Sequence, residues 1–488
     1  MKSSKILTLA VMASLLSTPY AWAAQKTEAA ATKTATAQTE TVTHKKAKSA
    51  KAAKVEKKAK AEKTAAAEKQ EKIATTATTA ETTTAGEPLP AENYTAAKLV
   101  SGGPKTTLAD SYASLKPDEN ALLVRDGADV TLSHGGITKS GASTDVLGSK
   151  FHGLNAAVLA ADGALSMDGC TIRTEADGAN AVFATGSKGT IKLHDSNIRT
   201  TGANSRGLDA TEGGSITADN INVGTTGLRS AALATEPDGA SVTVSKSTIN
   251  TSGEGSPLIY SKGDIKLSEA KGTAAASEIA VVEGDNAIHL EYVDLSGNGT
   301  HGVMLYQNKT REDGKDKGRF SAKQSALRSL KEGPLFYVTN TAARIYSELT
   351  TMQYLGGELI RVEGGQVGDA ANNGGDLTFM ANNQGLYGNV SVDSASTILL
   401  DLQNGSHWAG AINTDNKARK ADVNLDASSS WSVSADCYLN AFTDGNPSLT
   451  NVKGNGHTIY YNAADAANSW LGGKTYELQN GGYLKPNK

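Results

Sequence analysis

The chain has 488 residues, among them 50 Gly and only two Cys, and its formal net charge at pH 7 is −3. Two cysteines exclude the disulfide framework that stabilises many small secreted domains, so packing must hold this fold together. Beyond the first residues, no apolar stretch reaches the length of about eighteen residues that a membrane-spanning helix requires.

The first 23 residues have the layout of a secretory signal peptide. Lys2 and Lys5 precede an apolar run, Ile6–Leu16, and the small-residue site Ala21-Trp22-Ala23 follows. This order of basic, apolar and cleavage regions directs export, and the apolar run is too short to remain as a membrane anchor. We therefore predict a secreted or cell-surface protein that begins near Ala24, with no transmembrane segment after cleavage.

Residues 24–92 form a basic, low-complexity arm. Between Gln25 and Pro90 the chain is nearly all Ala, Lys, Thr and Glu, with too few large apolar side chains to offset the entropy of ordering a core. Up to Ile73, Lys outnumbers Glu by about nine, so the remainder of the chain carries about −12. This composition predicts a disordered linker, preceding an acidic body.

Two interpretations of the arm stay open, a solvated spacer and an electrostatic attachment to an anionic cell-wall or envelope component. Nucleic acid is not expected as a partner, because the chain is exported and the arm lacks aromatic residues for base stacking. The lysines that would carry attachment are Lys45, Lys46, Lys48, Lys51, Lys54, Lys57, Lys58 and Lys60.

From Gly153 onward the sequence repeats in steps of 24 to 26 residues. Each unit starts with a glycine and an apolar run, and contains two further short segments of alternating apolar residues. The starting glycines are Gly153, Gly178, Gly202, Gly227 and Gly253. The second segments contain Leu165/Met167, Ile191/Leu193, Ile216/Ala218, Val242/Val244 and Ile265/Leu267, and the third lie around Ile172, Ile198, Ile221 and Ile249.

Three short strands per unit predict a coil with three faces. One unit cannot bury its apolar side chains alone, but stacked units, about 4.8 Å apart, would align them in continuous columns. We therefore predict an all-β fold, a single-stranded right-handed parallel β-helix, over residues 93–384, interrupted by a charged loop at 310–318. Gly and Asn between the strands are expected to supply corners with positive φ.

Residues 385–488 are predicted to form further β-helix coils and a cap. Trp408 and Trp431 lie one repeat length apart, and His407 and His457 stand beside the Trp and Tyr clusters. Core or capping positions are one interpretation of the two Trp residues; the other is a binding surface on which their rings stack on sugars. His407 and His457 are candidate members of that binding surface.

Residues 333–488 resemble the β-helical passenger domains of bacterial autotransporter adhesins and related pectin-lyase-like proteins. The resemblance rests on Gly374-Gly-Asp-Leu-Thr, Leu402-Gln-Asn-Gly-Ser-His-Trp-Ala-Gly-Ala-Ile, Leu425-Asp-Ala-Ser-Ser-Ser-Trp and Asn455-Gly-His-Thr-Ile-Tyr-Tyr. It implies a right-handed β-helix outside the cell, often in adhesion. Because the chain stops at Gly482-Tyr-Leu-Lys-Pro-Asn-Lys without a translocator barrel, release or another export system is expected.

Catalytic motifs are weak. Polygalacturonase-like enzymes carry an ordered set of Asn-Thr-Asp, Asp-Asp, Gly-His-Gly and Arg-Ile-Lys; here Gly299-Thr-His301-Gly, Arg344-Ile-Tyr and Asn413-Thr-Asp415 are partial echoes in another order. His289 and His301 are therefore interpreted as strand or turn residues. No spacing resembles a metal site, although Asp168 and Asp195 lie at matching corners and could join a weak calcium site.

The sequence thus favours a non-enzymatic, adhesin-like binding or structural scaffold whose partner is a host or cell-surface polymer or glycan. The main alternative is a carbohydrate-active enzyme, a polysaccharide lyase or glycoside hydrolase, because acidic side chains from successive coils could still assemble. A structural component of an extracellular layer is a third possibility.

Overall fold

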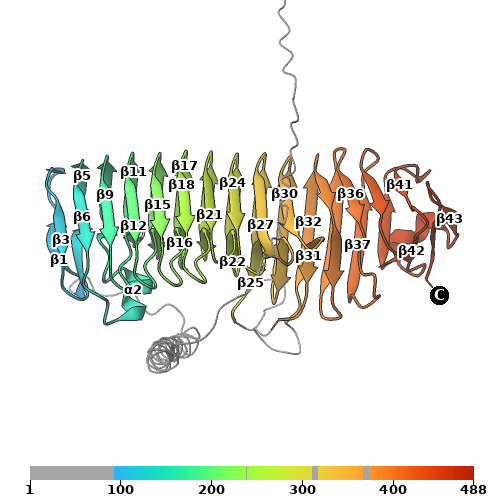
Figure 1. The fold of residues 1–488 in the computed structure, drawn as a ribbon, viewed down its shortest axis with the longest axis horizontal. Helices are drawn as coiled ribbons and strands as arrows, with labels where there is room; N and C mark the ends of the chain where they lie inside the picture. The colour runs from blue at the N-terminus through green and yellow to red at the C-terminus, as the bar shows by residue number, and fades with distance from the viewer. Residues whose placement is uncertain (1–92, 238, 310–316, 366–372, 488) are drawn as a thin grey trace, which may run out of the picture. The chain divides into compact units, whose positions relative to one another are not determined.

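The computed structural model describes residues 93–487, except 238, 310–316 and 366–372, and they form a parallel β-solenoid (Figure 1). The coils stack along one axis, with strand β1 at one end and β43 near the other. The predicted all-β parallel helix is confirmed. The signal peptide, the basic arm and most of the charged loop at 310–318 lie outside the described residues.

Three long parallel sheets, named A, B and C here, form the faces of the solenoid. Sheet A contains β1 (Thr95–Ser101), β4 (Glu119–Arg125), β7 (Val158–Ala161), β10 (Val182–Thr185), β13 (Leu208–Thr211), β16 (Leu233–Thr235), β19 (Ile259–Ser261), β22 (Ala280–Glu283), β25 (Val303–Tyr306), β28 (Phe336–Thr339), β31 (Glu358–Val362) and β34 (Asn389–Val392).

Sheet B is the longest and contains fourteen strands. They are β2 (Thr106–Leu108), β5 (Asp129–Ser133), β8 (Ala164–Asp168), β11 (Thr190–His194), β14 (Ser215–Asp219), β17 (Ser241–Ser245), β20 (Asp264–Ser268), β23 (Ala287–Glu291), β26 (Lys317–Lys323), β29 (Ala342–Glu348), β32 (Asp376–Asn382), β35 (Thr397–Gln403), β37 (Lys420–Leu425) and β40 (Ala441–Asp444).

Sheet C contains ten strands and ends before the other two. They are β3 (Tyr112–Ser114), β6 (Gly136–Lys139), β9 (Thr171–Thr174), β12 (Asn197–Thr200), β15 (Asn222–Thr225), β18 (Thr248–Thr251), β21 (Lys271–Ala274), β24 (Asp294–Gly297), β27 (Ala326–Glu332) and β30 (Thr351–Leu355).

Two short sheets, D and E, complete the C-terminal coils. Sheet D contains β33 (Gly385–Tyr387), β36 (His407–Gly410), β38 (Ser430–Val433) and β41 (Val452–Lys453), and sheet E contains β39 (Cys437–Leu439), β42 (Thr458–Tyr461), β43 (Tyr476–Glu477) and β44 (Tyr483–Pro486). The strands pair in parallel except β43 with β44. Sheet B runs across residue 385 without a break, so the repeats and the C-terminal coils share one sheet.

Apolar columns fill the interior, because inward side chains of successive coils lie in register. Ile198 pairs with Ile172 on one side and with Val223, not Ile221, on the other. The prediction that placed Ile221 in this column is therefore wrong by two positions. Both residues satisfy an alternation of period two, and Ile221 is instead buried in the turn before β15.

The glycines that start the units serve two different purposes. Gly153 and Gly178 have φ of 70° and 67°, as expected for positive-φ corners. At Gly227 the constraint is space, because a Cβ would lie 1.7 Å from the carbonyl oxygen of Gly202, and the same distance separates a Cβ at Gly253 from Gly227. Successive backbones thus approach too closely there for any side chain.

A short helix, α2 (Val146–His152), interrupts the repeat between β6 and β7. Asp145 caps its first turn by accepting a hydrogen bond from the Gly148 amide at 2.8 Å, and Gly153 ends it with a left-handed conformation. The repeat pattern did not predict this helix, because seven residues with few apolar positions leave no helical periodicity. A 3-10 helix, η2 (Ala466–Leu471), lies in the C-terminal cap.

Within the described ranges, no helix is long and apolar enough to cross a membrane. Cys170 and Cys437 are buried and unpaired thiols.

Candidate functional site

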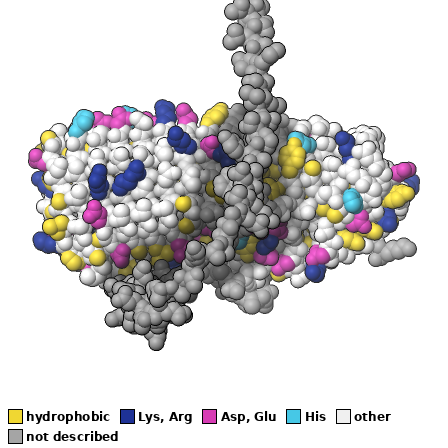
Figure 2. Space-filling model, in the orientation of Figure 1, with side chains coloured by type: hydrophobic (Ala, Val, Ile, Leu, Met, Phe, Trp, Pro, Cys, Tyr) yellow, Lys and Arg dark blue, Asp and Glu magenta, His cyan; other side chains and the backbone are white. Residues whose placement is uncertain are grey.

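At the corner that follows the sheet B strands, most coils present one outward side chain. The non-glycine residues with left-handed φ there are His134, Asp195, Asn220, Lys246, Glu269, Tyr292, Gln324 and Leu349, which precede sheet C strands, and Asn383 and Asn404, which precede sheet D strands. They follow the sheet B strands, and Figure 2 shows charged and histidine side chains gathered along the corresponding upper edge, in its left half. We call this set of residues the corner column.

At two positions, the corner column has residues that are uncommon in left-handed turns. Asn, Asp and Gly adopt left-handed φ at low cost, whereas Tyr292 has φ of 53° and Leu349 has φ of 48°. Their side chains are nevertheless 54% and 48% exposed, so burial does not repay the backbone strain. Strain retained without a packing reason is a feature of binding and catalytic sites.

A shallow open groove of about 910 Å³ runs along this corner, and we call it the corner groove. One side is formed by five successive members of the corner column, Lys246, Glu269, Tyr292, Gln324 and Leu349. The other side is formed by the first residues of the sheet C strands, Thr248, Lys271, Asp294, Ala326 and Thr351. The corner groove therefore crosses five coils parallel to the axis of the solenoid.

The corner groove is lined by charged groups of both signs. Lys246 and Lys271 provide two ammonium groups, and Glu269 and Asp294 provide two carboxylates. The Asp294 carboxylate is paired with the Arg328 guanidinium, which also donates to Gln353 at 3.1 Å. With one aromatic ring and no excess charge, these groups suit a long polar ligand that has both donors and acceptors.

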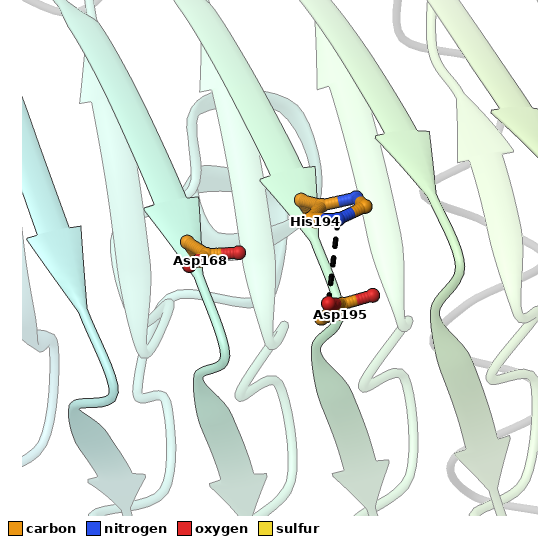
Figure 3. A group of neighbouring side chains, drawn as sticks. All are labelled: Asp168, His194 and Asp195. Atoms are coloured by element: carbon orange, nitrogen blue, oxygen red, sulfur yellow. Dashed lines mark ion pairs between the residues drawn. The ribbon is translucent and has the colours of Figure 1, made fainter.

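At the N-terminal end of the corner, Asp168, His194 and Asp195 come together (Figure 3). One ligand atom from each lies within 4.8 Å of the others. His194 Nε2 is 3.3 Å from an Asp195 oxygen, and His194 Nδ1 is 3.4 Å from Asp219. The structure thus brings Asp168 and Asp195 to the same corner of neighbouring coils, although Asp168 is in register with His194 and not with Asp195. Calcium binding there stays a prediction.

Asp195, and the Asp219 carboxylate beside His194, have further partners. Asn220 donates to Asp195 at 2.5 Å, and Ser245 donates to Asp219 at 2.7 Å. The hydrogen bond from Ser245 and the nearby Lys246 and His194 hold the pKa of Asp219 below its usual value. A nitrogen donor and two carboxylates, Asp168 half-buried and Asp195 exposed, differ from the all-oxygen shell that Ca²⁺ prefers.

A second polar group, the sheet A ion cluster, lies on the outer face of sheet A. Arg206 donates to Asp209 at 2.6 Å and pairs with Glu236 at 2.5 Å, while Lys262 lies 3.2 Å from Glu283. Lys150 of α2 lies 3.9 Å from Glu236. The cluster links α2 to four successive coils.

Two carboxyls of this cluster have pKa values displaced in opposite directions. Burial, and the neighbouring Glu236 charge, raise the pKa of Asp209 to about 7, against the opposing effect of Arg206. Burial also acts to raise the pKa of Glu236, but Arg206, Lys150 and Lys262 outweigh it and hold that pKa below its usual value. Both side chains are 0% exposed, so this pair faces other protein groups.

Trp408 and Trp431 are core residues, and the interpretation of their rings as a sugar-binding surface needs correction. Each is 1% exposed, and their ring centroids are 4.8 Å apart in a stack. Their indole nitrogens donate to the carbonyls of Gly388 and Gly410 at 2.9 and 3.0 Å. Their spacing of one repeat places both at the same inward position of neighbouring coils.

The two histidines predicted beside the Trp residues lie on the outside. His407 Nε2 is 2.5 Å from the Tyr387 hydroxyl, and His457 Nδ1 is 3.8 Å from Asp436. No recorded contact joins the two. The lysines of the basic arm, Lys45 to Lys60, lie outside the described residues, so attachment through them stays a prediction.

The three partial matches to polygalacturonase motifs do not lie on one face of the solenoid. His301 precedes β25 of sheet A, stacks on Tyr337 at 4.1 Å and lies 3.7 Å from Glu278. Arg344 is outward on β29 of sheet B. Asp415 lies in the loop before β37 and pairs with Lys417 at 2.9 Å. These positions do not build a polygalacturonase-like site.

Comparisons with protein-family models, curated proteins and solved structures yield no match for this chain.

Sequence reasoning missed the corner groove and the sheet A ion cluster. A signal for the ion cluster exists: the position that holds Thr185 and Thr211 in two coils holds Glu236, Lys262 and Glu283 in the next three. A signal for the corner groove exists in Tyr292 and Leu349, which replace the Asn and Asp typical of turns. Both become visible only once the coils are aligned residue by residue.

Proposed function

We propose that the protein is a secreted or cell-surface binding scaffold of the adhesin type that holds an extended glycan along the corner groove. The observation that carries the proposal is an open groove, lined by charged groups of both signs, that crosses five successive coils with Tyr292 at its centre. A groove without closed ends suits a polymer that continues beyond it.

The period of the groove supports a glycan. Successive coils are about 4.8 Å apart, and each sugar unit of an extended glycan advances the chain by a similar distance. Each unit would therefore meet an equivalent position in the next coil, with donors and acceptors from Lys246, Glu269 and Gln324. The exposed ring of Tyr292 offers an apolar face to a sugar and a hydroxyl at its edge.

The signal peptide and the resemblance of residues 333–488 to autotransporter passenger domains support a location outside the cell. Passenger-type solenoids present long faces to host or cell-surface polymers. The basic arm gives a second attachment, to an anionic cell-wall or envelope component. Deleting Lys45–Lys72 should lower retention on producing cells, most at low salt, because exposed charges are screened as ionic strength rises.

Titration of the mature protein with cellohexaose, polygalacturonate and hyaluronan tests glycan binding, with calorimetry as the readout. We expect at least one to bind, and Tyr292→Ala to weaken that binding about 5- to 30-fold through lost ring contact. The matched control is Tyr483→Ala, which removes a tyrosine of similar exposure far along the chain. Equal loss in both variants, or none in either, contradicts the assignment.

A carbohydrate-active enzyme is the second candidate, and the Asp209–Glu236 pair favours it. Two carboxyls with pKa values displaced in opposite directions provide the acid and the base that glycosidic cleavage needs. Their complete burial argues for a structural role instead. Release of reducing or unsaturated ends from the same polymers, abolished in Asp209→Asn, would establish the enzyme and overturn the scaffold.

A further inference from the structure

A buried lysine, Lys139, occupies an inward position of sheet C where the neighbouring coils have hydroxyl side chains. Lys139 is the last residue of β6 and is only 1% exposed. In the register of sheet C it pairs with Ser114 of the preceding coil. The following four coils hold Thr174, Thr200, Thr225 and Thr251 at this position.

The hydroxyl groups of this column meet the hydrogen-bonding needs of the turn after each strand. Thr200, Thr225 and Thr251 each donate to the backbone carbonyl five residues further along the chain. A buried ammonium costs much more to remove from water than a buried hydroxyl. The geometry of the coil therefore does not account for a lysine at position 139.

The Lys139 ammonium ends beside a buried asparagine that follows helix α2. Lys139 Nζ donates to the carbonyl of Gly141 at 2.7 Å, and Asn155 Nδ2 donates to the same oxygen at 2.8 Å. The two nitrogen atoms are thus no farther apart than the sum of these distances. Gly141 permits this approach, because a Cβ there would lie 2.7 Å from Lys139 Nζ.

The carboxamide of Asn155 has an oxygen without a partner. Asn155 is 0% exposed, and its Oδ1 accepts no hydrogen bond within the described residues. An unsatisfied buried acceptor is costly, so a native structure that retains one needs a reason. This oxygen is the atom that takes up negative charge when an amine attacks a carboxamide.

The surroundings of Lys139 favour its neutral, nucleophilic form. Burial lowers the pKa of Lys139 from 10.5 to about 8, although the charges of Glu119 and Asp118 act to raise it. A desolvated lysine amine with a lowered pKa is an activated nucleophile near neutral pH.

Glu119 places a carboxylate near both groups. It accepts a hydrogen bond from Ser114 at 2.9 Å, and Ser114 is in register with Lys139. Glu119 and Asn155 also occupy matching places in adjacent coils, each three residues before a paired position of sheet A. A carboxylate in this place can carry a proton between the amine and the carboxamide.

We propose that Lys139 and Asn155 form an intramolecular isopeptide bond, with Glu119 carrying the proton. The lone pair of the neutral Nζ attacks Cγ of Asn155, and the π pair of the carbonyl moves onto Oδ1. When that pair returns, the Cγ–Nδ2 bond breaks, and Nδ2 leaves as ammonia with the proton that Nζ loses through Glu119. One amine and one carboxamide give one secondary amide and one ammonia, so no oxidant or other reactant is needed.

The bond closes residues 139–155, with α2 among them, into a covalent ring. Such a link stabilises a fold by restricting the unfolded chain, as a disulfide does. Unlike a disulfide, it needs no oxidising environment, and both cysteines of this chain are unpaired thiols. The bond is independent of glycan binding in the corner groove.

Mass spectrometry of the purified mature protein tests the bond. We expect an intact mass lower than that of the sequence by one ammonia. Trypsin should release residues 126–150 joined to residues 151–173, because it does not cleave after an acylated Lys139. Cyclisation of an asparagine to a succinimide also releases ammonia but gives no joined peptide. An undiminished mass, with cleavage after Lys139 and separate peptides, overturns the proposal.

Variants identify the reacting groups. Lys139→Met and Asn155→Ala should each have the full mass of their sequence, whereas Lys192→Arg, at an exposed position of β11, should still lack one ammonia. Glu119→Gln should leave most chains unlinked. A mass deficit that persists in Lys139→Met overturns the bond, and complete linkage in Glu119→Gln overturns the proton route. The joined peptide of the wild type decides the matter even where a variant fails to fold.

Discussion

The outer face of sheet A and the corner between sheets B and C are made by the same coils. They differ in their polar side chains, which are buried on sheet A and exposed at the corner. On sheet A, the carboxyls of Asp209 and Glu236 are buried, and both pair with Arg206. At the corner, Lys246, Glu269 and Tyr292 project from left-handed turns into an open groove. One repeat thus produces a face that stabilises the protein and an edge that is available to a partner.

The largest effect should follow from breaking the sheet A ion cluster. Arg206→Met removes the guanidinium from two buried carboxyls and should lower the free energy of unfolding by about 3–5 kcal/mol. Arg199→Met is the control, because Arg199 is exposed on sheet C and its loss should cost less than about 0.5 kcal/mol. Urea unfolding measures both, and equal effects would show that the two faces do not differ.

The pH dependence of stability should expose the same cluster with a smaller effect. Because the folded protein raises the pKa of Asp209 from 3.8 to about 7, the folded state retains a proton that the unfolded state releases. This contribution to stability is complete below about pH 4 and is lost as pH rises to about 7. Glu236 acts in the opposite sense, since its lowered pKa contributes stability that is lost in acid.

The Asp209 contribution is isolated by comparing the wild type with Asp209→Asn between pH 4 and 8. Relative to this variant, the wild type should become less stable as pH rises through that window. Asp195→Asn at the exposed corner is the control and should track the wild type. A wild-type curve parallel to that of Asp209→Asn would remove Asp209 from the pH response.

The smallest effect should come from the corner, and it should have the opposite sign. Leu349→Asn places a residue that tolerates left-handed φ at a strained turn, and should raise the free energy of unfolding by about 0.5–1 kcal/mol. Gln324→Asn, at the corresponding position of the preceding coil, serves as the comparison. Destabilisation by Leu349→Asn would show that this side chain is held by packing.

The sequence was sufficient to predict the solenoid because its evidence is repeated in every coil. Apolar pairs such as Leu165/Met167 and Ile191/Leu193 recur at one spacing, and only stacking buries all of them. The exact residues that face the core in a single unit were harder to predict. Ile221 and Val223 fit the same alternation, and the register of β15 with β12 was needed to choose between them.

The candidate site was less predictable, since its members are brought together across coils and not within one motif. Asp168 and Asp195 could be paired in advance because their spacing is close to one repeat. Tyr292 and Leu349 are separated by 57 residues and an insertion, so the sequence alone did not place them in one groove. Trp408 and Trp431 show the reverse case, in which a conspicuous residue type is accounted for by the core.

Hydrogen–deuterium exchange of the mature protein, with and without a bound glycan from the three polymers above, tests glycan binding in the corner groove most directly. We expect added protection confined to the turns that hold Lys246, Glu269, Tyr292, Gln324 and Leu349, with the polymer recovered intact. Protection centred on sheet A, or shortened polymer after incubation, would contradict it.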